Sequence, residues 1–135
     1  RKSVPEIDYH AKARSFEILI VQLFEKMGFK NITPTGGASD KGVDIEAYDS
    51  NGEKLIIQCK HQSLVNPVKP TQVRDFAHVI QRENVTKGYF ITSSFFSPEC
   101  FYKENCGDKM VLIDRNELEK LLNEHGLSLS IIEKT

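Results

Sequence analysis

The chain has 135 residues, of which 39% are hydrophobic and 27% are charged. This length suits one domain with a single hydrophobic core, and no stretch resembles a membrane span or a signal peptide. The formal net charge of −1 argues against a protein that coats nucleic acid through bulk electrostatics.

The first predicted element is a helix over residues 9–27. Its apolar side chains recur at helical spacing, and Gly28 is placed to end it; they are Phe16, Leu19, Ile20, Leu23 and Met27. A short strand over 29–34 follows, and then a loop over 35–42 that is rich in turn formers.

A β-hairpin is predicted next, with strands over residues 43–48 and 55–60. The strands are joined by Asp49-Ser50-Asn51-Gly52, a sequence typical of a tight turn. A hairpin centred near the middle of this turn sets Asp44 opposite residue 57 or 58.

The second half of the chain alternates helices and strands. One helix is predicted over 70–83, a second begins after Ser97 as its cap, and a third begins after a capping box made by Asp114 and Glu117. Strands are predicted over 88–92, 109–113 and 127–131. The helical apolar stripes are Val73, Phe76, Ala77 and Ile80 in the first helix and Leu118, Leu121 and Leu122 in the last, which ends before Gly126. The alternation of Leu127, Leu129 and Ile131 favours the final strand. The whole chain is therefore predicted to be one mixed α/β domain.

Polar side chains gather at one end of the predicted hairpin. Alternation along a strand puts Asp44 and Glu46 on one face and likewise Gln58 and Lys60 on one face. A single carboxylate and lysine on a hairpin commonly face solvent. Here, however, Gln58 and Lys60 end a strongly apolar run, and the end of a buried strand is where α/β sheets commonly place sites.

These groups suit magnesium chemistry on a phosphodiester. Mg²⁺ takes oxygen ligands and often binds through one or two carboxylates plus substrate phosphate oxygens. Asp44, the Gln58 side-chain oxygen and the Cys59 backbone carbonyl are the predicted ligands, with Mn²⁺ as a substitute ion. Lys60 would orient or deprotonate the attacking water or hold the scissile phosphate.

The distribution of charge and the cysteines add weaker signals. Residues 54–98 carry 6 Lys/Arg against 2 Asp/Glu, which suits a local phosphate-facing surface or is an ordinary fluctuation. Three cysteines in a chain without secretory features favour reduced thiols and a cytoplasmic location. Because the chain begins at Arg1, we expect it to be a piece of a longer multidomain protein.

Several separated motifs resemble one nuclease family. They are Phe16-Glu17, Gly28-Phe29, Asp40-Lys41-Gly42-Val43-Asp44, Gln58-Cys59-Lys60, Gly88-Tyr89-Phe90-Ile91-Thr92 and Leu112-Ile113-Asp114. In this order they resemble the Mrr-like catalytic domain, a branch of the PD-(D/E)XK restriction-endonuclease superfamily in which the Glu of the second motif is often Gln. The resemblance covers about residues 14–124, and the domain core is expected over about 9–124 of a single domain spanning 1–135.

The resemblance implies a restriction-endonuclease-like α/β fold, with a central mixed β-sheet flanked by helices. It implies that Asp44 is the metal-binding acid, Gln58 the second ligand position and Lys60 the catalytic lysine. Glu17 matches an acid that often completes the metal site, although a solvated helix charge explains it equally well. Asp40 either binds a second metal or, by preference, holds the loop.

A second group of residues is a weaker match to DNA contacts. Gln72 faces the active centre or lies solvated on its helix, and Arg74 is close to the basic stretch. Thr92, Ser93 and Ser94 contact phosphate or shape a loop. His61 contacts phosphate or, by preference, is a surface histidine.

The function that these features favour is a Mg²⁺-dependent endonuclease that cuts DNA in restriction or anti-phage defence. A homodimer and a further domain for recognition are expected partners, and no membrane is involved. One alternative is a structure-selective nuclease resembling Holliday-junction resolvases, and another is a module of the same fold that binds nucleic acid without cutting. The spacing of Cys100, Cys106 and His125 matches no zinc site, and the Gly36-Gly37 loop lacks the ending of a nucleotide-binding loop.

Overall fold

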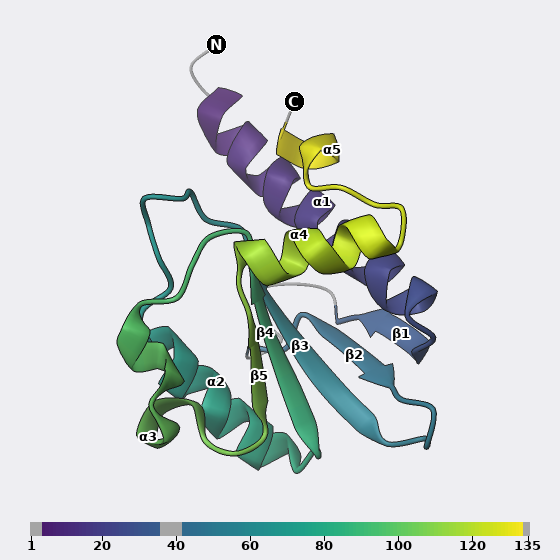
Figure 1. The fold of residues 1–135 in the computed structure, drawn as a ribbon, viewed down its shortest axis with the longest axis vertical. Coiled ribbons are helices and arrows are strands. Elements are labelled where there is room, and N and C mark those ends of the chain that lie inside the picture. The colour runs from purple at the N-terminus through teal and green to yellow at the C-terminus, as the bar shows by residue number, and fades with distance from the viewer. Residues whose placement is uncertain (1–3, 36–41, 134–135) are drawn as a thin grey trace.

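A computed structural model describes residues 4–35 and 42–133 of the chain. Five strands form one sheet in the order β1-β2-β3-β4-β5 (Figure 1). The strands are β1 (Lys30–Pro34), β2 (Ile45–Tyr48), β3 (Lys54–Lys60), β4 (Lys87–Thr92) and β5 (Met110–Ile113). β1, β2 and β3 pair antiparallel, while β3, β4 and β5 pair parallel. The predicted central mixed sheet is confirmed.

Helices cover both faces of this sheet. They are α1 (Val4–Lys26), α2 (Pro70–Glu83), α3 (Lys103–Cys106), α4 (Arg115–Glu124) and α5 (Ser130–Glu133), with a 3₁₀ helix, η2 (Pro98–Phe101). α1, α4 and α5 lie on one side, and α2 with α3 on the other (Figure 1). No helix in the described part of the chain is long and apolar enough to cross a bilayer.

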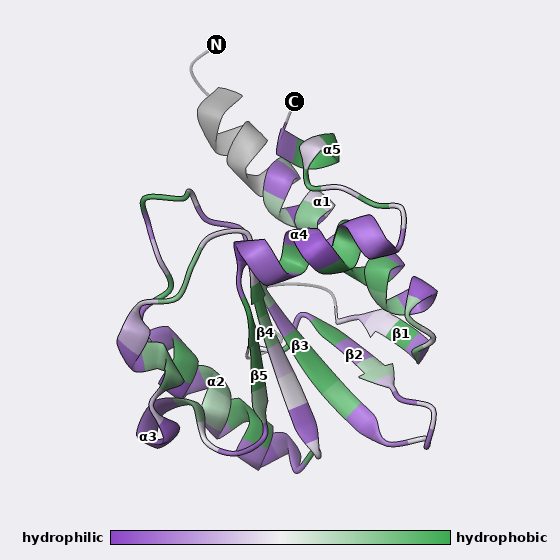
Figure 2. Ribbon diagram, in the orientation of Figure 1, coloured by the Kyte–Doolittle hydropathy of each residue, from purple (hydrophilic) through white to green (hydrophobic). Residues whose placement is uncertain are grey.

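Two apolar cores, one on each face, fix which way the side chains of β3 point. Ile57 packs with α1 and α4, whereas Ile56 packs with α2. Apolar residues follow the strands and the helix sides that cover them (Figure 2). By the period-two alternation of a strand, Gln58 and Lys60 therefore face α2, and Cys59 faces α1.

Most predicted elements agree with the structure because their signals are local. α2 spans the predicted residues, and Val79 joins its buried stripe while Ala77 is only partly buried. Gly28 has a φ of 96° directly after α1, a conformation that L side chains rarely adopt. Asp114 caps α4, since its carboxylate accepts the Glu117 N–H at 3.0 Å.

Two local predictions were wrong. Residues 127–131 do not form a strand, because Leu129 and Ile132 are buried at helical spacing while Ile131 is 60% exposed, and the segment ends in α5. Ser97 precedes a 3₁₀ helix rather than an α-helix, and its side chain makes no capping bond. Its hydroxyl instead lies 3.5 Å from the Cys100 sulfur.

Gly88 is a glycine at which the packing of α2 on β4 leaves no room for a methyl group. A Cβ at this residue would overlap the Ile80 side chain and lie 3.2 Å from Phe76 Cε2. Gly88→Ala should therefore lower the free energy of unfolding by about 1–3 kcal/mol, the usual cost of overpacking a core. Urea unfolding measures the change. A loss below about 0.5 kcal/mol, the range of an ordinary surface substitution, would contradict the close packing of α2 on β4.

Candidate active site

The hairpin brings Asp44 to the end of β3. Ile45 pairs with Ile57, so Asp44 lies opposite Gln58, as predicted. The Asp44 N–H donates to the Ile57 carbonyl at 3.0 Å, and the Asp44 Oδ2 accepts the Cys59 N–H at 2.7 Å. The strand backbone thus holds this carboxylate in place, half-buried at the edge of the sheet.

Gln58 and Lys60 line one cavity on the α2 side of the sheet. Its volume is about 280 Å³, and its lining residues are Gly42, Gln58, Lys60, Gln72, Asp75, Phe76 and Val79. Gln72 thus lies beside the two predicted active-site residues. Asp75 was missed from the sequence, although its position one helical turn after Gln72 is the signal that could have indicated it.

The Cys59 side chain packs on the α1 side of the sheet, near two carboxylates. Burial raises its pKa well above 9.0, and the charges of Asp44 and Glu17 raise it further. Both carboxylates are therefore close enough to act on one sulfur atom. Glu17 follows the buried Phe16 on α1, and its charge acts on the Cys59 thiol. The thiol itself stays protonated and is a poor nucleophile.

The oxygen atoms available at this end match a hard divalent cation. Within residues 4–35 and 42–133, no group of three or more His, Cys, Asp or Glu side chains could hold a metal ion. A site here would combine Asp44 with amide, carbonyl and water oxygens, which is a donor set that Mg²⁺ accepts. Asp40 lies outside the described residues.

Thr92, Ser93 and Ser94 are fully buried and hold the backbone around Lys60. The Thr92 hydroxyl donates to the Lys60 carbonyl at 2.8 Å, and the Ser94 hydroxyl donates to the Ser63 carbonyl at 2.8 Å. The Ser93 hydroxyl donates to the Gln62 carbonyl at 3.2 Å. The predicted phosphate contacts of Ser93 and Ser94 are at odds with this burial, and the alternative of loop formation describes them.

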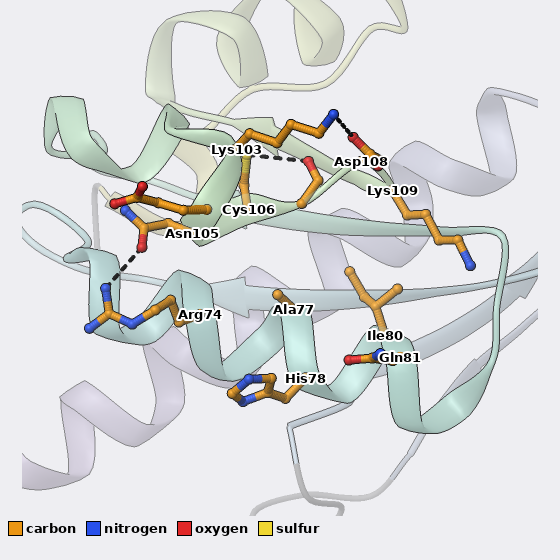
Figure 3. A pocket seen from close by; sticks show the side chains of 12 residues that line it. Arg74, Ala77, His78, Ile80, Gln81, Lys103, Asn105, Cys106, Asp108 and Lys109 are labelled. Atoms are coloured by element: carbon orange, nitrogen blue, oxygen red, sulfur yellow. Dashed lines mark hydrogen bonds and ion pairs between the residues drawn. The ribbon is translucent and has the colours of Figure 1, made fainter.

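Arg74 lines a different cavity, between α2 and α3, of about 340 Å³. Figure 3 shows its guanidinium directed at Asn105, to whose Oδ1 it donates at 2.9 Å. Asn105 is buried and donates in turn to the Glu99 carbonyl at 2.7 Å. Arg74 thus ties α2 to α3, which accounts for it without the predicted DNA contact.

His61 is not a plain surface histidine. Its ring stacks on Phe16 with centroids 5.5 Å apart, and its Nδ1 lies 2.8 Å from the Ser93 hydroxyl. Burial lowers its pKa from 6.5; the charge of Glu133 opposes this, and those of Lys12 and Arg115 add to it. His61 directly follows β3, and its contact with Phe16 of α1 puts it on the face opposite Lys60.

The lowered pKa of His61 gives a stability that depends on pH. The unfolded chain takes up the proton near 6.5 and the folded chain only at lower pH, so the free energy of unfolding falls as pH drops from about 6.5 through the folded pKa. Thermal unfolding across this range measures the fall, and His61→Gln should reduce it. If the free energy of unfolding falls equally with pH in His61→Gln, the pH dependence belongs to other groups. His125→Gln is the matched control.

The chain matches a known family over most of its length. Residues 9–122 match the family model Mrr_cat, described as restriction endonuclease. The type IV methyl-directed restriction enzyme EcoKMrr of Escherichia coli (strain K12) is 26% identical over 126 residues, which make up 87% of this chain and 41% of that enzyme.

Two solved structures share the fold. The DNA modification-dependent restriction endonuclease AspBHI superposes with a TM-score of 0.66 at 16% identity, covering 89% of this chain and 33% of that one. The MspJI restriction endonuclease in complex with a 27-mer oligonucleotide gives a TM-score of 0.63 at 18% identity, covering 98% and 34%. The chain thus spans well under half the length of these relatives.

Proposed function

The chain belongs to the Mrr_cat restriction endonuclease family, and from this premise we propose that it cuts DNA phosphodiester bonds with a divalent metal ion. The observation that carries the proposal is that the hairpin register sets Asp44 opposite Gln58, and Gln58 lines one cavity with Lys60. A carboxylate, an amide oxygen and an ammonium group at one point suit a phosphodiester and a cation together.

Asp44 and Gln58 would hold the metal, with the Cys59 carbonyl and Glu17 as further ligands. In an antiparallel ladder the N–H and C=O of one residue point to the same neighbouring strand. Because the Cys59 N–H points to Asp44, its carbonyl points to the same side. Magnesium, or manganese in its place, supplies Lewis acidity toward the phosphate and acidifies water when bound.

Lys60 would act on the reacting groups from within the cavity. As a neutral amine it would orient the attacking water and take its proton; as an ammonium group it would instead hold the scissile phosphate against developing charge. The bonds from Thr92 and Ser93 to its carbonyl, at 2.8 and 3.2 Å, fix the backbone from which it reaches. Gln72 and Asp75 would orient groups across the same cavity.

Gln58→Glu should strengthen metal binding. The added negative charge beside Asp44 acts on a divalent cation in a partly buried site, and we expect a roughly tenfold or greater decrease in the Mg²⁺ concentration for half-maximal cleavage. Titrating Mg²⁺ against the cleavage rate measures it. Gln81→Glu is the matched control, because it adds the same charge at an exposed position of α2 that does not line this cavity. An equal shift in both variants would contradict Gln58 as a ligand.

Recognition of DNA would involve more than this chain. EcoKMrr is named as methyl-directed and AspBHI as modification-dependent, and the chain spans only part of each. We propose that a further domain supplies sequence or modification preference. A homodimer would supply the two active centres that a double-strand break needs. A cytoplasmic location would keep the three free cysteines reduced.

The substrate class is tested by offering several nucleic acids under single-turnover conditions with Mg²⁺. Supercoiled plasmid, a four-way DNA junction and single-stranded RNA are compared. Cutting of plasmid, with a ratio of linear to nicked product that rises with protein concentration, would support a dimeric DNA endonuclease. Preference for the junction would favour the resolvase-like alternative. Binding to all DNA forms with no cutting at any metal concentration would favour the non-cutting module.

A further inference from the structure

A second, larger cavity lies at the same end of the sheet, on the α1 side. Its volume is about 610 Å³. Residues from α1, from the loop after β3, from α4 and from α5 line it; they are Lys12, His61, Gln62, Ser63, Leu64, Asn66, Arg115 and Glu133. Two of these carry a fixed positive charge and one a negative charge, and most of the others carry hydrogen-bonding groups.

This cavity is joined to Lys60 through Ser93. The Ser93 N–H donates to the Lys60 carbonyl at 3.2 Å. The Ser93 carbonyl accepts the Arg115 guanidinium at 3.0 Å, and the Ser94 carbonyl accepts the Arg115 N–H at 2.8 Å. One buried backbone segment thus positions both Lys60 and Arg115. The two side chains lie on either side of the end of β3.

The Arg115 guanidinium binds a carboxylate with the geometry that it would use for a phosphate. Its Nη1 and Nη2 each donate to a different oxygen of Glu133, both at 2.7 Å. This two-pronged geometry is the one by which arginine binds carboxylate and phosphate alike. The Arg115 side chain is only 17% exposed, so its fork is held rigidly.

Hydrogen bonds also fix the loop that forms the other wall. The Gln62 N–H donates to the Ser93 hydroxyl at 3.1 Å, and the Ser94 hydroxyl donates to the Ser63 carbonyl at 2.8 Å. Lys12 stands across from this loop on α1. A preformed cavity with two cations and fixed walls suits a ligand that carries phosphate oxygens.

We propose, resting on the function proposed above, that this cavity binds a DNA backbone phosphate beside the one at Lys60, with Lys12 and Arg115 as its cations. Glu133 occupies the phosphate position on Arg115 until DNA displaces it. Phosphates follow one another along each strand at a rise of about 3.4 Å, so DNA held at Lys60 carries further phosphates past the end of β3. Glu133 then sets how tightly the chain holds DNA.

Two substitutions with opposite expected effects test the proposal. Fluorescence anisotropy of a labelled duplex, without divalent metal, gives the DNA affinity between about 50 and 200 mM salt. Lys12→Gln should weaken binding and reduce the slope of log affinity against log salt by about one. Glu133→Gln should strengthen binding several-fold and steepen the slope, because it removes the carboxylate charge at the Arg115 Nη1 and Nη2 atoms, while Glu119 stays 3.3 Å from Nε. Circular dichroism and thermal unfolding check that each variant is folded.

Lys87→Gln is the matched control. Lys87 is exposed and pairs with Leu55 at the start of the parallel strands, the end opposite Lys60. An effect of Lys12→Gln no larger than that of Lys87→Gln, or a Glu133→Gln variant that binds DNA as the unaltered chain does, would overturn the proposal.

Further arms separate this proposal from its premise. Inorganic phosphate at millimolar concentration is the second ligand to test. If phosphate binding is weakened by Lys12→Gln while DNA affinity is unchanged, the cavity binds a small phosphate ligand and the DNA site is overturned. Cleavage of DNA by the unaltered chain with no change in either variant would overturn this proposal alone. No binding and no cleavage of DNA by the unaltered chain would overturn both.

Discussion

Lys60→Ala should abolish metal-dependent cleavage, lowering the single-turnover rate by about 10²–10⁴-fold. Among the described residues that line the cavity with Gln58, Lys60 is the single lysine. The fold should persist, because Thr92 and Ser93 hold the Lys60 backbone through its carbonyl and not through its side chain. Rapid-quench kinetics with saturating Mg²⁺ measures the loss.

Lys54→Ala is the control for the same substitution on the same strand. Lys54 begins β3 and forms an exposed ion pair with Glu46 at 3.5 Å, a contact worth little in water. Lys60→Arg then separates two roles. Arginine keeps the charge but does not give up its proton, so rescue would favour phosphate binding and no rescue would favour proton transfer. A rate within a few-fold of the unaltered protein in Lys60→Ala would place the centre elsewhere.

Asp44→Asn should remove both metal binding and cleavage. An amide oxygen can still accept the Cys59 N–H that now bonds Oδ2 at 2.7 Å, so the hairpin should remain folded. The negative charge is lost, and with it most of the attraction for a divalent cation. We expect a rate about 10²–10³-fold lower and a Mg²⁺ affinity reduced by at least roughly tenfold.

Titration calorimetry with Mg²⁺ separates this loss of metal from a loss of fold. Glu46→Gln is the matched control, because Glu46 lies two residues along the same strand and pairs with Lys54 at the hairpin surface. That variant should bind Mg²⁺ as the unaltered protein does. If Asp44→Asn also binds Mg²⁺ normally but does not cut, Asp44 would act on water or phosphate rather than on the metal.

The hairpin and its polar end were predictable because every signal for them lies within a few residues. A tight-turn sequence set the register, and period-two alternation put Gln58 and Lys60 on one face. The pairing of Ile45 with Ile57 agrees with that register. The roles of Asp44, Gln58 and Lys60 in metal binding and catalysis stay predictions until measured.

Other features depend on contacts between residues far apart in the chain. Ser94 bonds Ser63, and Arg74 bonds Asn105, each across 31 positions. A hydroxyl after a strand or a cation on a helix looks the same in the sequence whether it faces solvent or is buried. The strand predicted over 127–131 was wrong for a different reason. Alternating apolar residues over so short a stretch fit a strand or a helical turn equally well.

The central claim is tested most directly by incubating supercoiled plasmid with the unaltered chain, Asp44→Asn and Lys60→Ala across Mg²⁺ and Mn²⁺ concentrations, with a chelator as the blank. We predict cleavage that needs metal in the unaltered chain and is lost in both variants at every metal concentration. Cleavage that survives both substitutions, or that proceeds in the chelator, would contradict a metal-dependent centre built on Asp44 and Lys60.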